Sequence, residues 1–227
     1  ESRQEEERME FLHIAWAYKE MLLVGAATTA VISGASILLG MPLGLAFAFG
    51  LVSHNRPIRL FCAVYRSFWR GTPLLVQILL VFYLLPSIGL DLSPVTAAVL
   101  ALILNTSAFQ AEIFRGGLSA VPKGQVEAAQ MLGIAPITIR RRIVIPQLLR
   151  LVTPAITNEF ISILKNSSII SVISVTELLR TGQQIVSATY RPLEVYGLIA
   201  IIYIVMNLVI AQLGRRAEAR LARGARA

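Results

Sequence analysis

The sequence predicts an all-α membrane protein with about five transmembrane helices. Hydrophobic residues make up 56% of the 227-residue chain and its mean hydropathy is +0.68, whereas a soluble globular domain is about 45–50% apolar. These residues are gathered into stretches long enough to cross a bilayer, which takes about 20 apolar residues each. The five expected spans are residues 21–52, 71–90, 94–111, 151–172 and 195–213.

The first two spans carry recognisable local signals. The first is uninterrupted by charge and is long enough to tilt, or to bend at Pro42. Gly40 and Gly44 in this span have the GxxxG spacing that favours close contact between helices. Thr72 and Pro73 are expected at the opening of the second span, because proline is tolerated in the first turn of a helix.

The spans divide the chain into three parts. Residues 1–20 form an N-terminal segment, residues 21–213 a transmembrane domain and residues 214–227 a basic tail. The first span follows acidic residues and lacks a small-residue cleavage pattern. We therefore expect it to be retained rather than removed as a signal peptide.

The distribution of basic residues predicts the orientation in the membrane. An odd number of spans places the two termini on opposite sides, and short cytoplasmic loops accumulate Lys and Arg. Fifteen of these residues lie in segments 53–70, 112–150 and the basic tail, whereas five lie in the segments on the other side. We expect an external N-terminus and a cytoplasmic C-terminus.

Composition also excludes several functions. The net charge of +8 does not indicate nucleic acid binding, because the basic residues lie between and after apolar spans. Cys62 is the single cysteine, and no Cys/His cluster offers a set of metal ligands. The sequence contains no GxxxxGK[ST] phosphate loop. If the chain takes part in ATP-driven transport, the ATPase must be another polypeptide. Five spans are few for a complete transporter, which commonly builds its path between two repeats, so a dimer is expected.

Residues 127–146, EAAQMLGIAPITIRRRIVIP, form a basic segment between apolar spans. Small Ala and Gly side chains let a short helix lie close against another protein, and Pro136 and Pro146 are expected to limit the helix on either side. The three consecutive arginines favour the cytoplasmic face. An ordinary basic loop is the alternative interpretation.

This segment resembles the cytoplasmic EAA loop of bacterial ABC-importer permeases. The family pattern is E-A-A, three residues, Gly, nine residues, Ile, one residue and Leu-Pro, and in this chain only the Leu is replaced, by Ile145. The resemblance implies that the matching residues couple the chain to an ATPase. These residues are Glu127, Ala128, Ala129, Gly133, Ile143 and Pro146.

Three further segments resemble the polar amino acid branch of these permeases. They are RGTPLLVQ at residues 70–77, NTSAFQAEIFRGGLSAVPKGQ at residues 105–125 and NEFISILKNSSIISVISVTEL at residues 158–178. Two departures from the family pattern are Phe109, where the family has Tyr, and Asn166, where it commonly has Asp.

The resemblance implies a permease with the fold of type I ABC importers, located in the bacterial cytoplasmic (inner) membrane and importing polar amino acids. It implies a second permease subunit, identical or a sibling. It also implies two ATP-binding subunits, which carry the ATP and Mg, and an extracytoplasmic amino acid-binding protein. The chain itself is then a transport subunit rather than an enzyme.

Glu159 is the leading candidate for substrate binding. A charged side chain at the centre of a bilayer costs about 2.5 kcal/mol or more, so a carboxylate there indicates function. Ser162 and Asn166 follow at three and seven positions and share its helix face. This polar stripe could instead bond only to a neighbouring helix. The resemblance places substrate-contacting acids at Glu159 and Asn166, and the asparagine removes one negative charge.

Other polar groups of the spans have two interpretations. Gln77 and Asn105 could line the same cavity as Glu159, or bond helix to helix. Lys165 is expected to extend along the membrane toward the interface rather than to bind a ligand. Outside the spans, Glu127 could simply be an exposed carboxylate in the first turn of a short helix.

Glu112 and Arg115, at positions i and i+3, could form a local ion pair, which we interpret as structural.

Two alternative functions stay open. The chain could be an ABC permease for another small polar solute. It could be a gradient-driven transporter or channel in which Glu159 and Lys165 handle protons or ions. A membrane-embedded hydrolase is not supported, because His13 and His54 lie in predicted flanking regions on opposite sides of the membrane.

Overall fold

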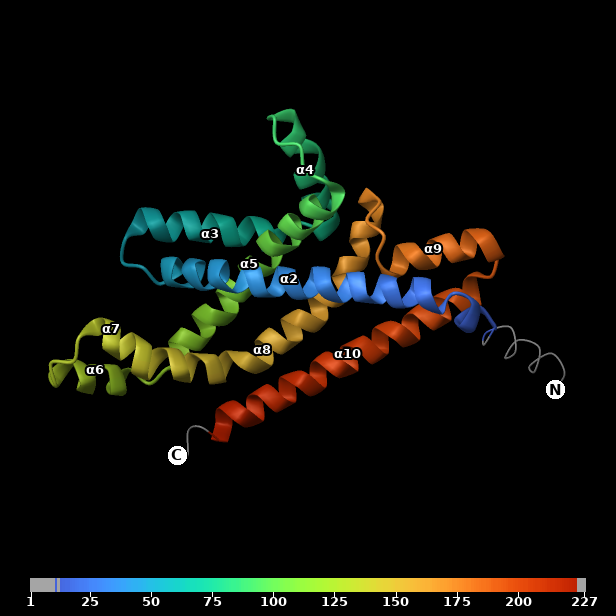
Figure 1. Ribbon diagram of the computed structural model, residues 1–227. Helices are drawn as coiled ribbons and strands as arrows, with labels where there is room; N and C mark the ends of the chain where they lie inside the picture. Colours follow the sequence, from blue (N-terminus) through green and yellow to red (C-terminus); the bar gives the residue numbers. More distant parts are fainter. Residues whose placement is uncertain (1–10, 12, 224–227) are drawn as a thin grey trace. The chain divides into compact units, whose positions relative to one another are not determined.

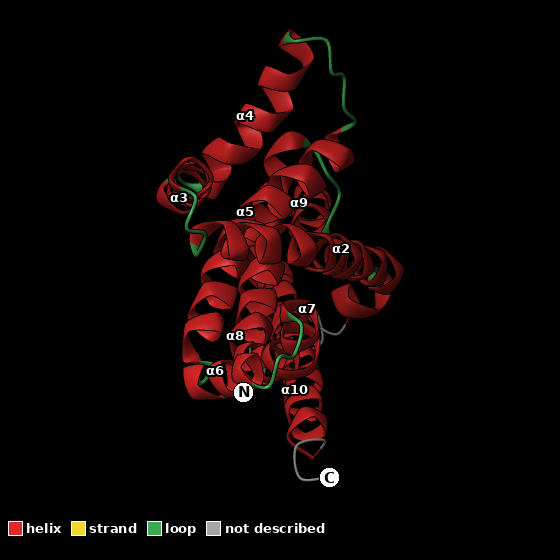
Figure 2. Cartoon of the chain, turned by 90° about the vertical axis from the view of Figure 1, so that its left-hand side faces the viewer, coloured by secondary structure: helices red, strands yellow, loops and turns green. Residues whose placement is uncertain are grey.

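The computed structural model describes residue 11 and residues 13–223, and every regular element in this part of the chain is a helix (Figures 1 and 2). The elements are α2 (Lys19–Leu51), α3 (Arg56–Gly71), α4 (Leu74–Ser87), α5 (Pro94–Ala120), α6 (Lys123–Met131), α7 (Pro136–Ile139), the π-helix η1 (Arg140–Val144), α8 (Ile145–Asn166), the 3-10 helix η2 (Ser167–Ile173), α9 (Leu178–Thr189) and α10 (Pro192–Arg223).

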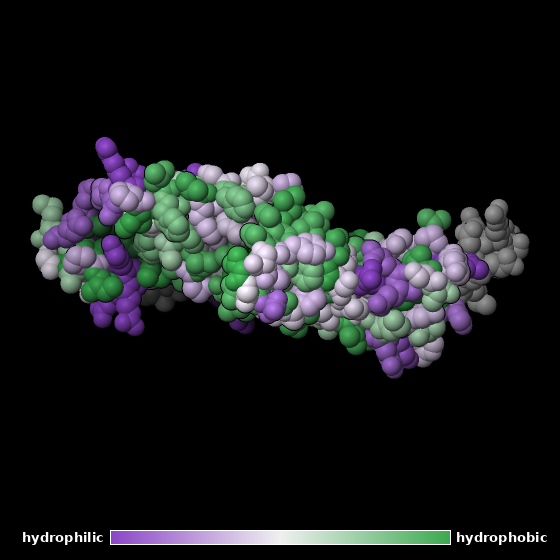
Figure 3. All heavy atoms as spheres, turned by 90° about the horizontal axis from the view of Figure 1, so that it is seen from above, coloured by the Kyte–Doolittle hydropathy of each residue, from purple (hydrophilic) through white to green (hydrophobic). Residues whose placement is uncertain are grey.

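Three of these helices, α2, α5 and α10, are each long and apolar enough to cross a membrane. Two broken pairs, α3 with α4 and residues 136–173 with α9, raise the number to as many as five. Large hydrophobic areas are exposed on the face drawn in Figure 3, as lipid contact requires. The prediction of about five spans therefore agrees with the upper number.

The second predicted span, residues 71–90, differs from the structure. Its helix, α4, has 14 residues and is too short to cross alone. Thr72 has extended backbone angles of φ −112° and ψ 149° and separates α4 from α3. The residue before a proline is disfavoured in helical conformation, so Pro73 explains the break. By contrast, α2 continues through Pro42.

The chain forms two compact units, and each is described by itself. Of the described residues, the first comprises residue 11 and residues 13–36, 73–103 and 161–209. Its core contains Ile14, Leu22, Leu178, Ile185, Val195 and Ile199. Gly182 allows α9 to approach α10 closely, because a Cβ atom there would lie 1.9 Å from Ile199 Cδ1.

A buried carboxylate connects three helices of this first unit. Glu177 precedes α9, and its carboxylate accepts hydrogen bonds from the backbone N–H groups of Leu179 at 2.9 Å and Arg180 at 2.7 Å. The Tyr203 hydroxyl on α10 donates to it at 3.1 Å. The Thr29 hydroxyl on α2 lies 3.5 Å from Glu177 Oε2, and it accepts a hydrogen bond from the backbone N–H of Leu178 at 3.1 Å. The side chain thus caps α9 and holds it against α2 and α10.

The second unit comprises the described residues 37–72, 104–160 and 210–223. Ala48, Phe114, Leu148 and Val152 form part of its core. Gly44 lets α2 pack against α5, because an added Cβ atom would lie 2.8 Å from Gln110 Cβ, which agrees with the close contact expected from its GxxxG spacing. On α3, the ring of Tyr65 stacks on Phe47 of α2 at 3.8 Å between centroids.

Candidate functional site

The first candidate site is the segment from α6 to the start of α8, which lies in the second unit (Figure 1). Helix α6 begins after Pro122 and ends at Met131. At its end, the N–H of Ile134 donates to the carbonyl of Ala129 at 3.1 Å, and the N–H of Gly133 donates to the carbonyl of Gln130 at 2.9 Å. These two bonds define a Schellman motif, which reverses the chain toward α7.

Gly133 has a conformational role within the chain, and its expected close approach to another protein stays a prediction. Its φ of +71° lies in the left-handed region that glycine adopts without strain. A Cβ atom added there would meet no atom within 4 Å, so space within the chain does not require glycine. Backbone conformation therefore explains this residue within the chain.

The three residues of the E-A-A pattern do not share one environment. Ala129 is buried in the chain, whereas Glu127 and Ala128 are exposed. Glu127 is the fifth residue of α6, so the interpretation that placed it in the first helical turn is wrong. A hydrogen bond that Gln147 Nε2 donates to Gln125 Oε1 at 2.7 Å joins α8 to α6.

Pro146 does not limit a helix, contrary to the expectation. The chain continues helically from η1 into α8, and Pro146 is the second residue of α8. In a regular α-helix its ring would clash with the carbonyl group of Arg142. The wider π turn at residues 140–144 directly precedes it and relieves this contact. Pro136, by contrast, begins α7 as expected.

A cavity of about 520 Å³ lies between α6, η1 and α8. Its lining includes Ala128, Ala129, Ile143 and Pro146, which are four of the six residues predicted to couple to an ATPase. Large apolar side chains are exposed around it, with Met131 90%, Leu132 79% and Ile137 70% exposed. We call these three side chains and the cavity the α6–α7 surface. Such an exposed apolar patch beside three arginines is typical of a protein interaction site.

The second candidate site is the carboxylate of Glu159 on α8. Thr106 on α5 donates a hydrogen bond to Glu159 Oε1 at 2.9 Å. Gln110, one turn further along α5, donates to Thr106 at 3.3 Å and to the carbonyl of Ile37 at 3.1 Å. The positive charge of Arg70 also interacts with the carboxylate. Glu159 is half-buried, so part of it stays accessible to a ligand.

The other predicted substrate residues are distributed over both units. Asn105 lies with Glu159 in the second unit, and its amide donates to the carbonyl of Trp69 at 3.3 Å. Gln77, Ser162 and Asn166 belong to the first unit, where Gln77 is completely buried. The idea that all five line one cavity stays a prediction.

Sequence reasoning missed two α5 side chains, namely Thr106, which bonds to Glu159, and Gln110, which bonds to Thr106. Thr106 and Gln110 are four positions apart and so lie on one helix face. Both are completely buried. Their periodicity within an apolar span was the available signal. Sequence reasoning also missed the burial of Glu177, because this residue lies in a polar stretch between two predicted spans.

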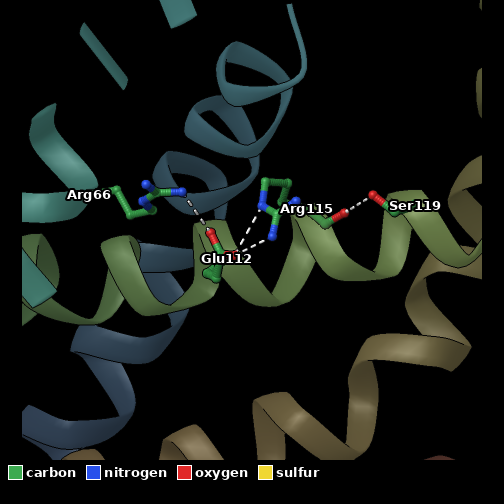
Figure 4. Close-up of polar contacts among 4 residues, drawn as sticks. All are labelled: Arg66, Glu112, Arg115 and Ser119. Carbon is green, nitrogen blue, oxygen red and sulfur yellow. Dashed lines mark hydrogen bonds and ion pairs between the residues drawn. The ribbon is translucent and has the colours of Figure 1, made fainter. Parts of the chain in front are cut away.

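The predicted ion pair between Glu112 and Arg115 is confirmed, and it is part of a larger cluster (Figure 4). Arg115 Nε donates to Glu112 Oε1 at 3.0 Å, and a second guanidinium nitrogen contacts the same oxygen. Arg66, which comes from α3, donates to Glu112 Oε2 at 3.3 Å. One carboxylate thus holds α3 against α5.

Comparisons with known proteins find similar permease proteins of bacterial transport systems. The chain is 36% identical to the arginine transport system permease protein ArtQ of Bacillus subtilis over 201 residues, which cover 88% of this chain and 92% of the relative. It is 37% identical to the histidine/lysine/arginine/ornithine transport system permease protein HisM of Salmonella typhimurium over 206 residues, covering 86% and 88%.

Solved structures confirm the predicted type I ABC importer permease fold. A crystal structure of an amino acid ABC transporter with histidines matches with a TM-score of 0.84 at 40% identity, over 92% of this chain and 98% of that chain. The MetNI methionine ABC transporter matches with a TM-score of 0.77 at 18% identity, over 90% and 98%, which supports the fold alone.

A family model matches residues 40–223, which is most of the chain. Its description is "binding-protein-dependent transport system inner membrane component". Together with the membrane-length helices, this match places the protein in the inner membrane with several spans. The chain belongs to the family of inner-membrane components of binding-protein-dependent transport systems.

Proposed function

We propose that this chain is the permease subunit of an ATP-driven importer of polar amino acids. The observation that carries the proposal is its 36% identity to an arginine permease across 88% of the chain. Two permease subunits, identical or related, form the translocation path. Two separate subunits bind ATP and Mg, and an extracytoplasmic binding protein delivers the amino acid.

The α6–α7 surface is the docking site for the ATP-binding subunits. It combines exposed apolar side chains with a cavity of about 520 Å³, and the three arginines of η1 flank it. A short basic segment of this kind stays on the cytoplasmic face of the membrane. A cytoplasmic α6–α7 surface in turn gives an external N-terminus and a cytoplasmic C-terminus.

Glu159 contacts the transported amino acid. Its carboxylate can pair with the α-ammonium group or with a basic side chain, and this attraction is stronger in a low-dielectric site than in water. Ser162 and Asn166 provide polar groups further along α8. Asn166 in place of an acid lowers the negative charge of the site, so both neutral and cationic amino acids are accepted.

Uptake by the reconstituted complex tests the transport proposal. Liposomes that contain the permease, its ATP-binding subunits and its binding protein should accumulate labelled amino acid only when ATP is present on the side of the membrane that carries the ATP-binding subunits. Vanadate should stop this uptake. Uptake driven by an ion gradient in the absence of any ATPase would instead establish the secondary-transporter alternative.

Met131→Glu tests the docking site. This side chain is 90% exposed, so a carboxylate there leaves folding unchanged but places a charge in an apolar contact. We expect at least a tenfold loss of transport and of co-purified ATPase, since burial of an unpaired charge costs more than about 1.4 kcal/mol. Leu193→Glu, at an equally exposed position on α10, is the control and should retain the ATPase. Normal ATPase binding by Met131→Glu would contradict the assignment.

A further inference from the structure

A second basic cavity lies in the second unit, beside the start of α3. It has a volume of about 800 Å³ and shares no lining residue with the cavity at the α6–α7 surface. Its lining consists of four cationic and four apolar residues: Arg56, Arg59, Arg66, Arg115, Leu51, Pro57, Leu60 and Ala63. The proposed transport mechanism assigns no role to this site.

The cavity carries excess positive charge. Glu112 bridges Arg66 and Arg115, as described above (Figure 4). Within residue 11 and residues 13–223, neither Arg56 nor Arg59 forms an ion pair, and Arg59 Nη1 donates to the carbonyl of Ser53 at 3.1 Å. Four guanidinium groups therefore accompany one carboxylate, which leaves three positive charges uncompensated in this cluster.

An apolar surface continues from the cavity along α3. Leu60, Phe61 and Val64 are spaced so that they share one helix face, and all three are more than half exposed. In a chain that spans a bilayer, this face can contact acyl chains. The combination of a cationic cavity with an adjoining apolar stripe matches a molecule that has an anionic head and apolar tails.

We propose that this cavity binds the headgroup of an anionic phospholipid. A guanidinium presents five N–H donors in a planar fork that matches phosphate oxygens, and Arg56 and Arg59 have no carboxylate partner in the described chain. The phosphodiester lies between these two side chains and the remaining donors of Arg66. The acyl chains follow the exposed stripe of α3. Basic cavities at the ends of membrane helices bind lipid headgroups in this way.

A lipid fits this surface better than a soluble protein does. An acidic protein could satisfy the arginines, but it would leave the apolar stripe of α3 uncovered. A lipid covers both. This inference depends on membrane insertion and not on the transported substrate, so it stands or falls separately from the proposed function.

Lipid retention by the purified complex tests the proposal. The complex is placed in bilayers of equal parts phosphatidylethanolamine and phosphatidylglycerol, extracted with mild detergent, and weighed by native mass spectrometry. The wild type should retain phosphatidylglycerol preferentially. Each arginine near an anionic lipid contributes about 1 kcal/mol, which is about fivefold in affinity. The double variant Arg56→Gln/Arg59→Gln should therefore bind about 25-fold more weakly.

A matched control separates this site from general charge. Arg215→Gln/Arg216→Gln removes the same charge from exposed positions of α10 and should retain the lipid as the wild type does. Equal losses in the two double variants would overturn the proposal, as would equal retention of both lipids by the wild type. If the first double variant does not assemble, the single variant Arg56→Gln replaces it, with a fivefold loss expected.

Photocrosslinking identifies the occupant directly. A phosphatidylglycerol with a photoactivatable acyl chain should label α3 of the wild type, and the Arg56→Gln/Arg59→Gln variant should lose this label. A wild-type α3 that acquires no lipid label, or a label that the double variant retains in full, would overturn the proposal.

Discussion

Glu159 and Glu177 are both carboxylates within the helical part of the chain, but the protein surrounds them differently. Glu177, in the first unit, is completely buried and accepts bonds from two backbone N–H groups and the Tyr203 hydroxyl, with Thr29 at 3.5 Å. Glu159, in the second unit, is half-buried, and within the described chain its one hydrogen bond comes from Thr106.

The difference lies in unused acceptor capacity. A carboxylate can accept about four hydrogen bonds, so Glu177 is nearly satisfied by the protein, whereas Glu159 has room for a ligand. We infer that the same residue type maintains the fold at one position and is available for binding at the other. The contrast predicts that changes at Glu177 alter stability, whereas changes at Glu159 alter transport.

Glu177→Ala should have the largest effect. It leaves two N–H groups and a hydroxyl without their acceptor in a buried site, and each costs about 1–3 kcal/mol. We expect a loss of roughly 3–9 kcal/mol in the free energy of unfolding, seen as a marked drop in thermal stability and in the yield of assembled complex. The measurement is thermal unfolding of the purified complex.

Glu194→Ala is the control for this change. Glu194 pairs with Arg191 at 3.3 Å near the start of α10, where a partly exposed ion pair contributes at most about 1 kcal/mol. A stability change at Glu177→Ala as small as that of the control would remove the distinction between the two carboxylates.

Glu159→Gln should have the next largest effect, and on transport. The amide keeps the shape and can still accept from Thr106, so the complex should assemble normally. A hydrogen bond to a charged group contributes about 1.5–3 kcal/mol, so kcat/KM should fall about 10- to 100-fold, and more for cationic than for neutral amino acids. Uptake assays on matched amounts of complex measure this.

Lys165→Gln removes a charge from the same helix and serves as the control. Lys165 is exposed in the last turn of α8, and we expect its variant to transport close to the wild-type rate. Unchanged kinetics of Glu159→Gln for every amino acid would instead show that the polar stripe of α8 serves helix packing.

The length of each apolar run predicted the helices whose only requirement is that they cross a bilayer. The spans at α2, α5 and α10 follow from their continuous apolar runs, because a bilayer requires a minimum length. The division between α3 and α4 is a local backbone effect of Pro73. Thr72-Pro73 signalled a helix start, but not that the preceding sixteen residues form a separate helix.

Identification of individual side-chain roles was less complete, since these depend on tertiary contacts. The E-A-A spacing located the α6–α7 surface, but burial of Ala129 and the left-handed backbone of Gly133 required the structure. Glu159 was found because it interrupts an apolar span. Glu177 was missed because its partners Thr29 and Tyr203 lie 148 and 26 positions away in the sequence.

The smallest effects should come from removal of one donor at each carboxylate. Tyr203→Phe deletes one of several donors to Glu177, and a net hydrogen bond contributes about 0.5–1.5 kcal/mol, so stability should fall by about 1 kcal/mol with uptake nearly unchanged.

Thr106→Val deletes the donor to Glu159, which frees an acceptor and removes the group that orients the carboxylate. We expect KM to change about three- to tenfold, since that range corresponds to about 0.7–1.4 kcal/mol, with a smaller change in thermal stability. Thermal unfolding and uptake kinetics on both variants complete the test. If Thr106→Val lowers stability and Tyr203→Phe alters KM, the two carboxylates have the opposite roles to those inferred from their hydrogen bonds.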